Sequence, residues 1–308
     1  MLSGPFSWLY RKLLSDTTRR RSEEVILTIA ILSFLVHLLI IYLVQFDVLD
    51  LDKGSELLKN PIAAIYTPFS FILVYEVYLL IYYLPKSITT YISKQYEIIT
   101  LIIIRRLFKD LSSLSLSNEW FTIKYDLQFT YDLVASVLLF FLIFLFLAQS
   151  RKRYRTLKGN ERQQEGVGNF IRMKKVLATG LVLVNIFVAI HSFEQWLAGV
   201  FDPSAPGVAF QNINNIFFEQ FFNILIIVDV VLLLFSFFHT DEFHKVIRNS
   251  GFVISTILIR LSFSVSGLLN TALIVSALLF GLLILVIYNR FEKFIALEEA
   301  GTEQLRKG

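Results

Sequence analysis

Five charged residues lie within or at the end of apolar stretches of this sequence, where an ionisable side chain has few polar neighbours. They are Glu76, Arg105, Arg106, Asp229 and Arg260. An unpaired charge at the centre of a bilayer costs about 2.5–3.5 kcal/mol on insertion scales, so charges at such depth are normally paired or line a polar route. These residues are therefore candidates for an ion pathway or for ion pairs within a membrane.

The depths of these charges predict two ion pairs. At about 1.5 Å per helical residue, Glu76 and Arg105 lie roughly 13 Å and 16 Å from the same membrane edge. By the same count Asp229 and Arg260 lie roughly 15 Å and 18 Å deep. We therefore expect Glu76 to pair with Arg105 and Asp229 with Arg260. Three interpretations stay open: pairs that only hold helices together, a polar permeation or proton path, and arginines that reach an interface without pairing.

The adjacent arginines also raise the question of a voltage sensor. That device needs several arginines at three-residue spacing, which Arg105 and Arg106 do not provide.

Four polar residues within the apolar stretches are candidates for a proton or polar relay. They are His37, His191, Thr100 and Ser255. The two histidines lie in different stretches, where an interhelical hydrogen bond is the default interpretation and a proton relay is the alternative. Thr100 and Ser255 each precede an intramembrane arginine on the same stretch.

Known catalytic and metal-binding motifs are absent from the sequence. It has no cysteine, no phosphate-binding glycine loop, no HExxH and no nucleophile elbow. His239 and His244 flank Asp241 and Glu242, but a spacing of five does not place both rings on one helical face. We expect a solvated helix cap there, and no enzyme activity, cofactor or metal site.

The composition indicates that the protein lies in a membrane. Its 308 residues are 55% hydrophobic and 18% charged, with a mean hydropathy of +0.63. A soluble domain is about 45–50% apolar and about 25% charged. This composition excludes a soluble globular protein, a disordered chain and a nucleic-acid-binding domain. The net charge of +4 fits basic residues kept on the cytoplasmic side of a membrane.

The apolar stretches predict eight membrane helices. They cover residues 25–46, 62–84, 98–104, 133–147, 176–191, 213–238, 252–259 and 268–288. The first is read as a retained span, because no small-residue cleavage site follows it. With the N-terminus inside, most Lys and Arg fall on the inner side and the acidic segment 47–56 falls outside, which satisfies the positive-inside rule. We expect a protein of the plasma (inner) membrane with both termini cytoplasmic.

The order of these stretches repeats along the chain. Residues 133–142 resemble 273–282, and residues 98–105 resemble 253–260. The predicted fold is therefore all-α, with two four-helix repeats of parallel orientation. The predicted divisions are an amphipathic cytoplasmic segment 1–23, a first repeat 24–150, a basic cytoplasmic linker 151–173, a second repeat 174–292 and a cytoplasmic tail 293–308.

Each half resembles the phosphate-starvation-inducible E (PsiE) family of small four-span membrane proteins. The resemblance rests on an acidic residue in the second span, a Thr- or Ser-containing third span that ends in Arg, and a plain apolar fourth span. These features are Glu76, Thr100 and Arg105 in the first half, and Asp229, Ser255 and Arg260 in the second. The resemblance implies a tandem duplicate of that fold, and the family has no well-defined activity to carry over.

Two functions are consistent with the sequence. The first is a channel or transporter for a small ion, with the acidic and arginine helices lining the route. The alternative is a non-catalytic sensor or partner subunit whose ion pairs are structural. Expected partners are the lipid bilayer, anionic lipid bound by the basic linker at the inner surface, and either a second copy of the chain or another membrane subunit. A membrane enzyme would need a convergent set of catalytic residues, which the sequence lacks.

Overall fold

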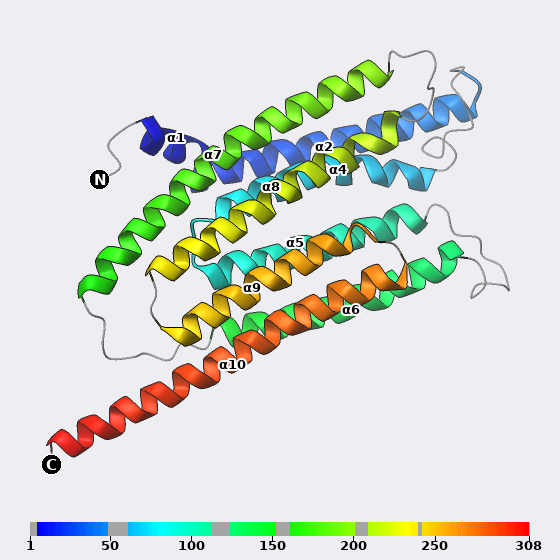
Figure 1. The fold of residues 1–308 in the computed structure, drawn as a ribbon. Coiled ribbons are helices and arrows are strands. Elements are labelled where there is room, and N and C mark those ends of the chain that lie inside the picture. Colours follow the sequence, from blue (N-terminus) through cyan, green and yellow to red (C-terminus); the bar gives the residue numbers. More distant parts are fainter. Residues whose placement is uncertain are drawn as a thin grey trace. The chain divides into compact units, whose positions relative to one another are not determined.

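The computed structural model describes residues 5–48, 61–111, 124–151, 161–200, 209–239, 242–265 and 267–307. Within these residues the secondary structure consists of nine α-helices and one 3-10 helix (Figure 1). Their bounds are α1 Pro5–Leu13, α2 Asp16–Gln45, η1 Pro61–Ile65, α4 Tyr66–Tyr83, α5 Ile88–Leu111, α6 Lys124–Ser150, α7 Glu161–Val200, α8 Ala209–His239, α9 Phe243–Ser262 and α10 Leu268–Lys307. The all-α prediction is confirmed.

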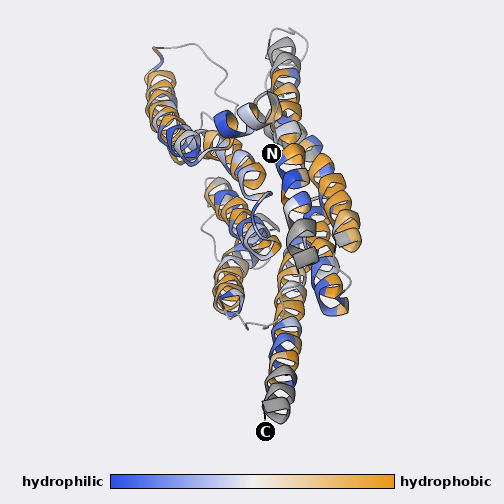
Figure 2. Cartoon of the chain, turned by 90° about the vertical axis from the view of Figure 1, so that its left-hand side faces the viewer, coloured by the Kyte–Doolittle hydropathy of each residue, from blue (hydrophilic) through white to orange (hydrophobic). Residues whose placement is uncertain are grey.

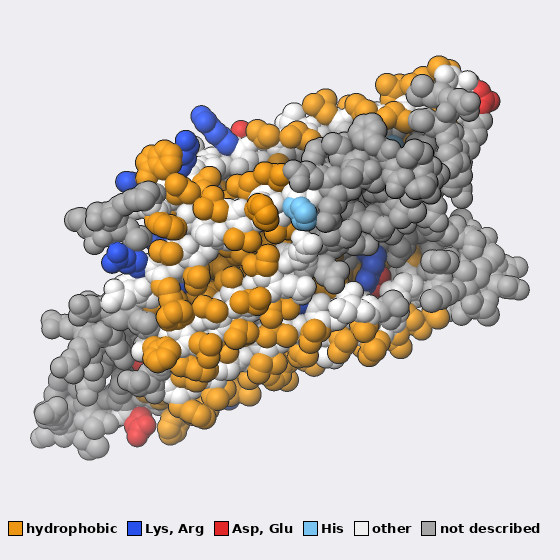
Figure 3. All heavy atoms as spheres, turned by 45° about the horizontal axis from the view of Figure 1, so that its top comes forward, with side chains coloured by type: hydrophobic (Ala, Val, Ile, Leu, Met, Phe, Trp, Pro, Cys, Tyr) orange, Lys and Arg blue, Asp and Glu red, His pale blue; other side chains and the backbone are white. Residues whose placement is uncertain are grey.

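Among the residues that the structure describes, four segments are long and apolar enough to cross a membrane. They are Asp16–Gln45, Leu127–Ser150, Gln220–Phe238 and Leu268–Glu298. Thr67–Tyr83 is a shorter apolar helix. In Figure 2 hydrophobic residues occupy long parts of these helices, and Figure 3 shows hydrophobic side chains over much of the described surface on one face. The chain is therefore a helical membrane protein, while the eight-span repeat stays a prediction.

The chain divides into two compact units. Unit 1 consists of Met1–Tyr83, Leu101–Leu133 and Val176–Leu225, and unit 2 consists of Leu84–Thr100, Val134–Lys175 and Ile226–Gly308. Each unit takes segments from both predicted repeats, so this division does not test the repeat. Helix α2 begins at Asp16, inside the predicted N-terminal segment, and α10 continues to Lys307 through most of the predicted tail.

In unit 1, tyrosines of α4 attach that helix to the end of α1 and to the start of α2. Tyr75, Tyr78 and Tyr82 recur at the three- and four-residue spacing that places side chains on one helical face. The Tyr75 hydroxyl donates to Glu23 Oε2 at 2.9 Å, the Tyr78 hydroxyl donates to the backbone carbonyl of Leu13 at 2.9 Å, and the Tyr82 hydroxyl donates to Asp16. Phenol groups thus satisfy the polar end of α2 while their rings cover apolar surface.

The part of α2 that follows its charged first turns presents an open apolar surface. Leu32, Leu35, Val36 and Leu39 are each more than half exposed. In water such a surface would be unfavourable, whereas lipid solvates it. Lipid contact is therefore the environment that this helix requires.

In unit 2, small residues allow α9 and α10 to lie side by side (Figure 1). The pairs Gly251/Ser255 on α9 and Ala277/Gly281 on α10 have the four-residue spacing of close helix contacts in membranes. A Cβ atom at Gly251 would lie 2.7 Å from Cγ1 of Ile284. This close approach lets the Ser255 hydroxyl donate to the carbonyl of Ala277 at 2.6 Å.

Helix α5 joins this contact through Tyr96. Its hydroxyl lies 2.7 Å from Ser255 Oγ, and because the Ser255 proton goes to a carbonyl, Tyr96 is the donor. A Cβ atom at Gly281 would overlap with the Tyr96 hydroxyl. The Tyr96 ring also meets Phe146 of α6 edge-on, with ring centroids 5.0 Å apart. The absence of a side chain at Gly281 is thus what admits Tyr96.

We predict that Gly281→Ala destabilises the protein by about 1–3 kcal/mol, the usual cost of overpacking a core. The added methyl group must displace the Tyr96 hydroxyl from Ser255. Thermal unfolding in detergent measures the loss. The matched control is Gly180→Ala in α7, where no heavy atom lies within 4 Å of an added Cβ, so stability should stay equal or rise slightly. Equal losses in the two variants would contradict this packing.

Candidate functional site

A sealed polar network joins α5, α8 and α9 within unit 2. Asp229 Oδ2 accepts a hydrogen bond from Arg260 Nη2 at 2.7 Å, and Asp229 Oδ1 accepts one from the Tyr91 hydroxyl at 2.9 Å. Gln95 Nε2 lies 3.4 Å from Asp229 Oδ2, and Gln95 Oε1 accepts from Arg260 Nη2 at 3.0 Å. The structure therefore contains the Asp229–Arg260 pair that the depths predict.

The network is buried, and most of its polar atoms are hydrogen-bonded, although Arg260 Nη1 makes no hydrogen bond within the described residues. Asp229 is 1% exposed and Arg260 is 6% exposed. A buried ion pair recovers its desolvation cost only when further hydrogen bonds satisfy its atoms, and here Tyr91 and Gln95 supply them. These two residues are four apart on α5, so they present both groups to the same carboxylate. Such an arrangement is suited to holding three helices together.

A second ion pair, in unit 1, joins α5 to α6. Arg106 Nε lies 2.5 Å from Asp132 Oδ2, and Arg106 Nη2 donates to Asp132 Oδ1 at 2.7 Å. The contact of Nη2 with Oδ1 is a charge-assisted hydrogen bond, while the contact of Nε with Oδ2 is an ion pair without hydrogen-bond geometry. Gln128 Nε2 also donates to Asp132 Oδ1 at 3.0 Å, and the Asp132 side chain is fully buried.

The sequence interpretation missed Asp132. It directly precedes the predicted apolar stretch 133–147, but the membrane-length segment of α6 begins at Leu127, so Asp132 lies inside that segment. A polar residue in the first turns of a span pairs as readily as one at its centre. The signal that could have found it was Arg106, an intramembrane arginine for which no acidic partner had been assigned.

The predicted pair between Glu76 and Arg105 stays a prediction. Glu76 is buried in α4, yet among the described residues no ion pair within 4.0 Å joins it to Arg105. The two side chains interact electrostatically at longer range. Successive residues on a helix point about 100° apart, so Arg105 points away from the direction in which Arg106 meets its carboxylate.

His37 and His191, the two histidines predicted as candidates for a relay, both lie in unit 1 but have different surroundings. The ring nitrogen Nδ1 of His37 lies 2.5 Å from Thr67 Oγ1, which joins α2 to α4. His191 is exposed and stacks on Phe187 of its own helix, with ring centroids 6.4 Å apart. His37 thus makes the interhelical contact that was the default interpretation.

Thr100 and Ser255 are both buried and both donate to backbone carbonyls. Thr100 Oγ1 donates to the carbonyl of Tyr96 at 3.1 Å, one turn earlier on α5. Ser255 takes part in the contact between α9 and α10 described above. In these positions the hydroxyls satisfy main-chain groups and stabilise helix packing.

A polar cavity of about 480 Å³ lies in unit 2 among α5, α6, α9 and α10. Hydroxyl and charged groups dominate its wall. The lining residues are Ser87, Thr89, Thr90, Ser93, Lys94, Glu97, Leu147, Ser150, Arg151, Arg248, Leu285, Tyr288, Asn289 and Glu292. Lys94 Nζ pairs with Glu97 Oε2 at 2.5 Å. The sequence interpretation missed this site; the hydroxyl cluster at the start of α5 was its signal.

A group of three residues, Glu242, His244 and Glu292, lies near this cavity in unit 2. His244 was expected in a solvated cap together with His239, whose side chain lies outside the described residues. Instead, His244 Nε2 contacts Glu292 of α10 at 3.0 Å. Glu292 is distant in sequence, so no local pattern could reveal this group.

No protein-family model, curated protein or solved structure matches this chain. The resemblance to the PsiE family stays an expectation from the sequence. What the fold and the site define is the class: a helical membrane protein with buried ion pairs.

Lys174 is a buried cation just before the apolar part of α7. Its Nζ donates to the backbone carbonyl of Lys86 at 3.1 Å and lies 4.8 Å from the centre of the Phe170 ring. Burial, reinforced by the positive charge of Arg248, lowers the pKa of Lys174 to about 8, although Asp229 opposes the shift. Folding therefore disfavours the charged form of this amine.

We predict that Asp229→Leu alone destabilises the protein by about 3–5 kcal/mol, because it leaves the Arg260 guanidinium buried without its carboxylate. The double variant Asp229→Leu with Arg260→Met should recover much of this loss, since neither charge remains. Unfolding in detergent, followed by circular dichroism, measures both. Additive losses in the double variant would show that the two charges do not depend on one another.

We predict that stability rises as the pH increases from about 8 to 10.5. In that window the unfolded chain, with an ordinary lysine pKa of 10.5, binds a proton that folded Lys174 does not bind. The rise should be absent in Lys174→Met and kept in Lys175→Met, the neighbouring control. Thermal unfolding at several pH values measures it, and an unchanged rise in Lys174→Met would refute the assignment.

Proposed function

We propose that the protein moves a small ion across the membrane, and that the polar cavity of unit 2 is where the ion binds. The observation that carries this proposal is the cavity itself. A volume of about 480 Å³ lined by hydroxyls and charges is costly to maintain among apolar helices unless it holds water or a solute.

The wall of the cavity has groups that can replace water around an ion. Serine and threonine hydroxyls both donate and accept hydrogen bonds. Ser87, just before α5, and Thr89, Thr90 and Ser93 in the first turns of α5 line the cavity. Charged side chains of both signs add longer-range attraction. Small shifts of these side chains would let a hydrated ion enter and leave.

The buried ion pairs support a structural role rather than a route. Asp229 already accepts hydrogen bonds from three side chains, and an ion could bind it only by displacing them. This differs from the sequence hypothesis, in which the acidic and arginine helices line the path. In the present proposal these helices hold the walls of the cavity in place.

A second candidate function is a non-catalytic partner or sensor subunit. The observation that favours it is the open apolar face of α2, which offers a broad surface to another membrane protein or to a second copy of the chain. In that case the cavity would hold only water, and the protein would conduct nothing by itself.

The proposal also includes the number of membrane crossings and the side on which the termini lie. Eight crossings with both termini cytoplasmic would place the start of α5 and the end of α6 at the inner surface, so the cavity would open to the cytoplasm. The basic residues Lys94, Arg151 and Arg248 on its wall agree with that side of a plasma membrane, where anionic lipid is also available.

We predict that Thr90→Phe reduces ion flux at least tenfold, because the ring would occupy the cavity. Thr90 is exposed on the cavity wall, so the fold should tolerate the change. Flux of H⁺, Na⁺, K⁺ and Cl⁻ is measured with fluorescent indicators in vesicles that contain the purified protein, at several voltages and pH values.

The matched control is Ser276→Phe, at an exposed position of α10 outside the cavity wall, which should conduct like the wild type. Absence of flux of all four ions through the wild type would reject transport of these ions and favour the partner-subunit function. Equal flux in Thr90→Phe and wild type would reject the cavity as the route.

A further inference from the structure

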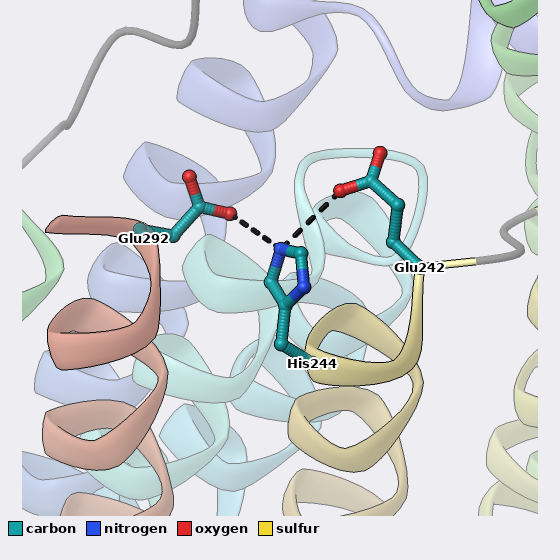
Figure 4. A group of neighbouring side chains, drawn as sticks. All are labelled: Glu242, His244 and Glu292. Atoms are coloured by element: carbon teal, nitrogen blue, oxygen red, sulfur yellow. Dashed lines mark hydrogen bonds and ion pairs between the residues drawn. The ribbon is translucent and has the colours of Figure 1, made fainter. Parts of the chain in front are cut away.

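Two carboxylates converge on a single ring nitrogen at the start of α9. Figure 4 shows Glu292 and Glu242 on opposite sides of His244, both directed at the same atom. His244 Nε2 lies 3.0 Å from Glu292 Oε1 and 3.2 Å from Glu242 Oε2. One ligand atom from each residue lies within 4.8 Å of the others.

A proton alone satisfies this arrangement poorly. Nε2 carries at most one hydrogen, and one N–H cannot point at two carboxylates on different sides. The two carboxylates also repel each other unless positive charge lies between them. From this geometry we propose that Glu242, His244 and Glu292 bind a divalent transition-metal cation, with Zn²⁺ or Mn²⁺ as the best matches.

The donor set selects this class of cation. One imidazole nitrogen and two carboxylate oxygens are ligands of Zn²⁺ and its neighbours, whereas Ca²⁺ and Mg²⁺ prefer oxygen alone. Ligands at about 2.0–2.1 Å from a tetrahedral Zn²⁺ lie about 3.3–3.4 Å from one another. Two of the three separations, 3.0 Å and 3.2 Å, are close to that spacing. The two carboxylate oxygens lie within 4.8 Å of each other, so the side chains would draw together around the ion.

Glu242 is directed to this site rather than to its own helix. It occupies the N-cap position of α9, yet its side chain makes no capping hydrogen bond. N-cap side chains normally accept from the free backbone N–H groups of the first turn. Here the carboxylate instead reaches His244 through Oε2 and Lys245 through Oε1, at 2.7 Å from Lys245 Nζ.

Neighbouring groups hold the other two ligands. The Tyr288 hydroxyl donates to Glu292 Oε1 at 2.7 Å, and its ring stacks on His244 with centroids 5.7 Å apart. Outer contacts of this kind orient metal ligands. Lys245 and Arg248 carry positive charge close by, and Arg248 lies 4.3 Å from the centre of the Tyr288 ring. These cations weaken binding, so we expect a reversible site and not a permanently occupied one.

The helix framework brings the ligands together in advance. Glu242 and His244 begin α9 and Glu292 lies on α10, two helices joined by the contacts at Gly251 and Ser255 described above. Glu292 also lines the polar cavity, through which a cation can reach the site. The metal site does not depend on whether the protein transports an ion.

The test uses the full-length protein purified in detergent and treated with a chelator. Isothermal titration with ZnCl₂ and with MnCl₂ should show one site per chain for at least one of the metals, and the same metal should raise the unfolding temperature. Glu292→Gln and His244→Ala should each weaken binding at least tenfold and lose the thermal shift. Glu298→Gln, an exposed residue on the same helix, is the matched control and should bind like the wild type.

Glu242→Gln serves if Glu292→Gln or His244→Ala fails to fold, because the Glu242 side chain is more exposed than either. It too should weaken binding tenfold. Failure of wild-type protein to bind either metal would overturn the proposal. So would wild-type affinity in a folded His244→Ala or Glu242→Gln variant. Flux in vesicles is measured separately, so loss of metal binding with normal flux, or the reverse, separates this site from the proposed function.

Discussion

A carboxylate inside a bilayer must receive its hydrogen bonds from the protein, because hydrocarbon supplies none. Asp229 therefore gathers Tyr91 and Gln95 from α5 and Arg260 from α9, and so determines which helices meet in unit 2. Asp132 does the same in unit 1, where it joins α6 to α5. For each of these carboxylates, side chains of neighbouring helices donate the hydrogen bonds that water would otherwise donate. The helices must therefore stay together to keep the carboxylate satisfied.

Helices α9 and α10 must also approach each other closely. This approach depends on residues with little or no side chain. Gly251 and Gly281 leave room on α9 and α10 for Ile284 and Tyr96. The hydroxyl of Tyr96 then reaches Ser255, which completes a polar contact among three helices. The same register of α9 against α10 brings Glu292 to His244, so the packing of small residues also sets the geometry of the proposed metal site.

Hydropathy predicted the helices well, because each apolar stretch needs a helix to satisfy its backbone in lipid. Depth along the helices also predicted the pairing of Asp229 with Arg260. Depth alone does not give the direction of a side chain, so it did not predict that Arg106 contacts Asp132. Tyr91, Gln95 and Glu292 could not be predicted, because their roles depend on contacts between helices far apart in sequence.

The difference between α2 and α8 has a consequence for how the chain is assembled during synthesis. Helix α2 exposes apolar residues along most of its length. It can therefore enter the lipid by itself, before α4 has been synthesised. Helix α8 carries Asp229, whose strongest partner, Arg260, lies on a helix that is synthesised later. Release of α8 into lipid is therefore costly until α9 has emerged, so the ion pair favours insertion of α8 and α9 together.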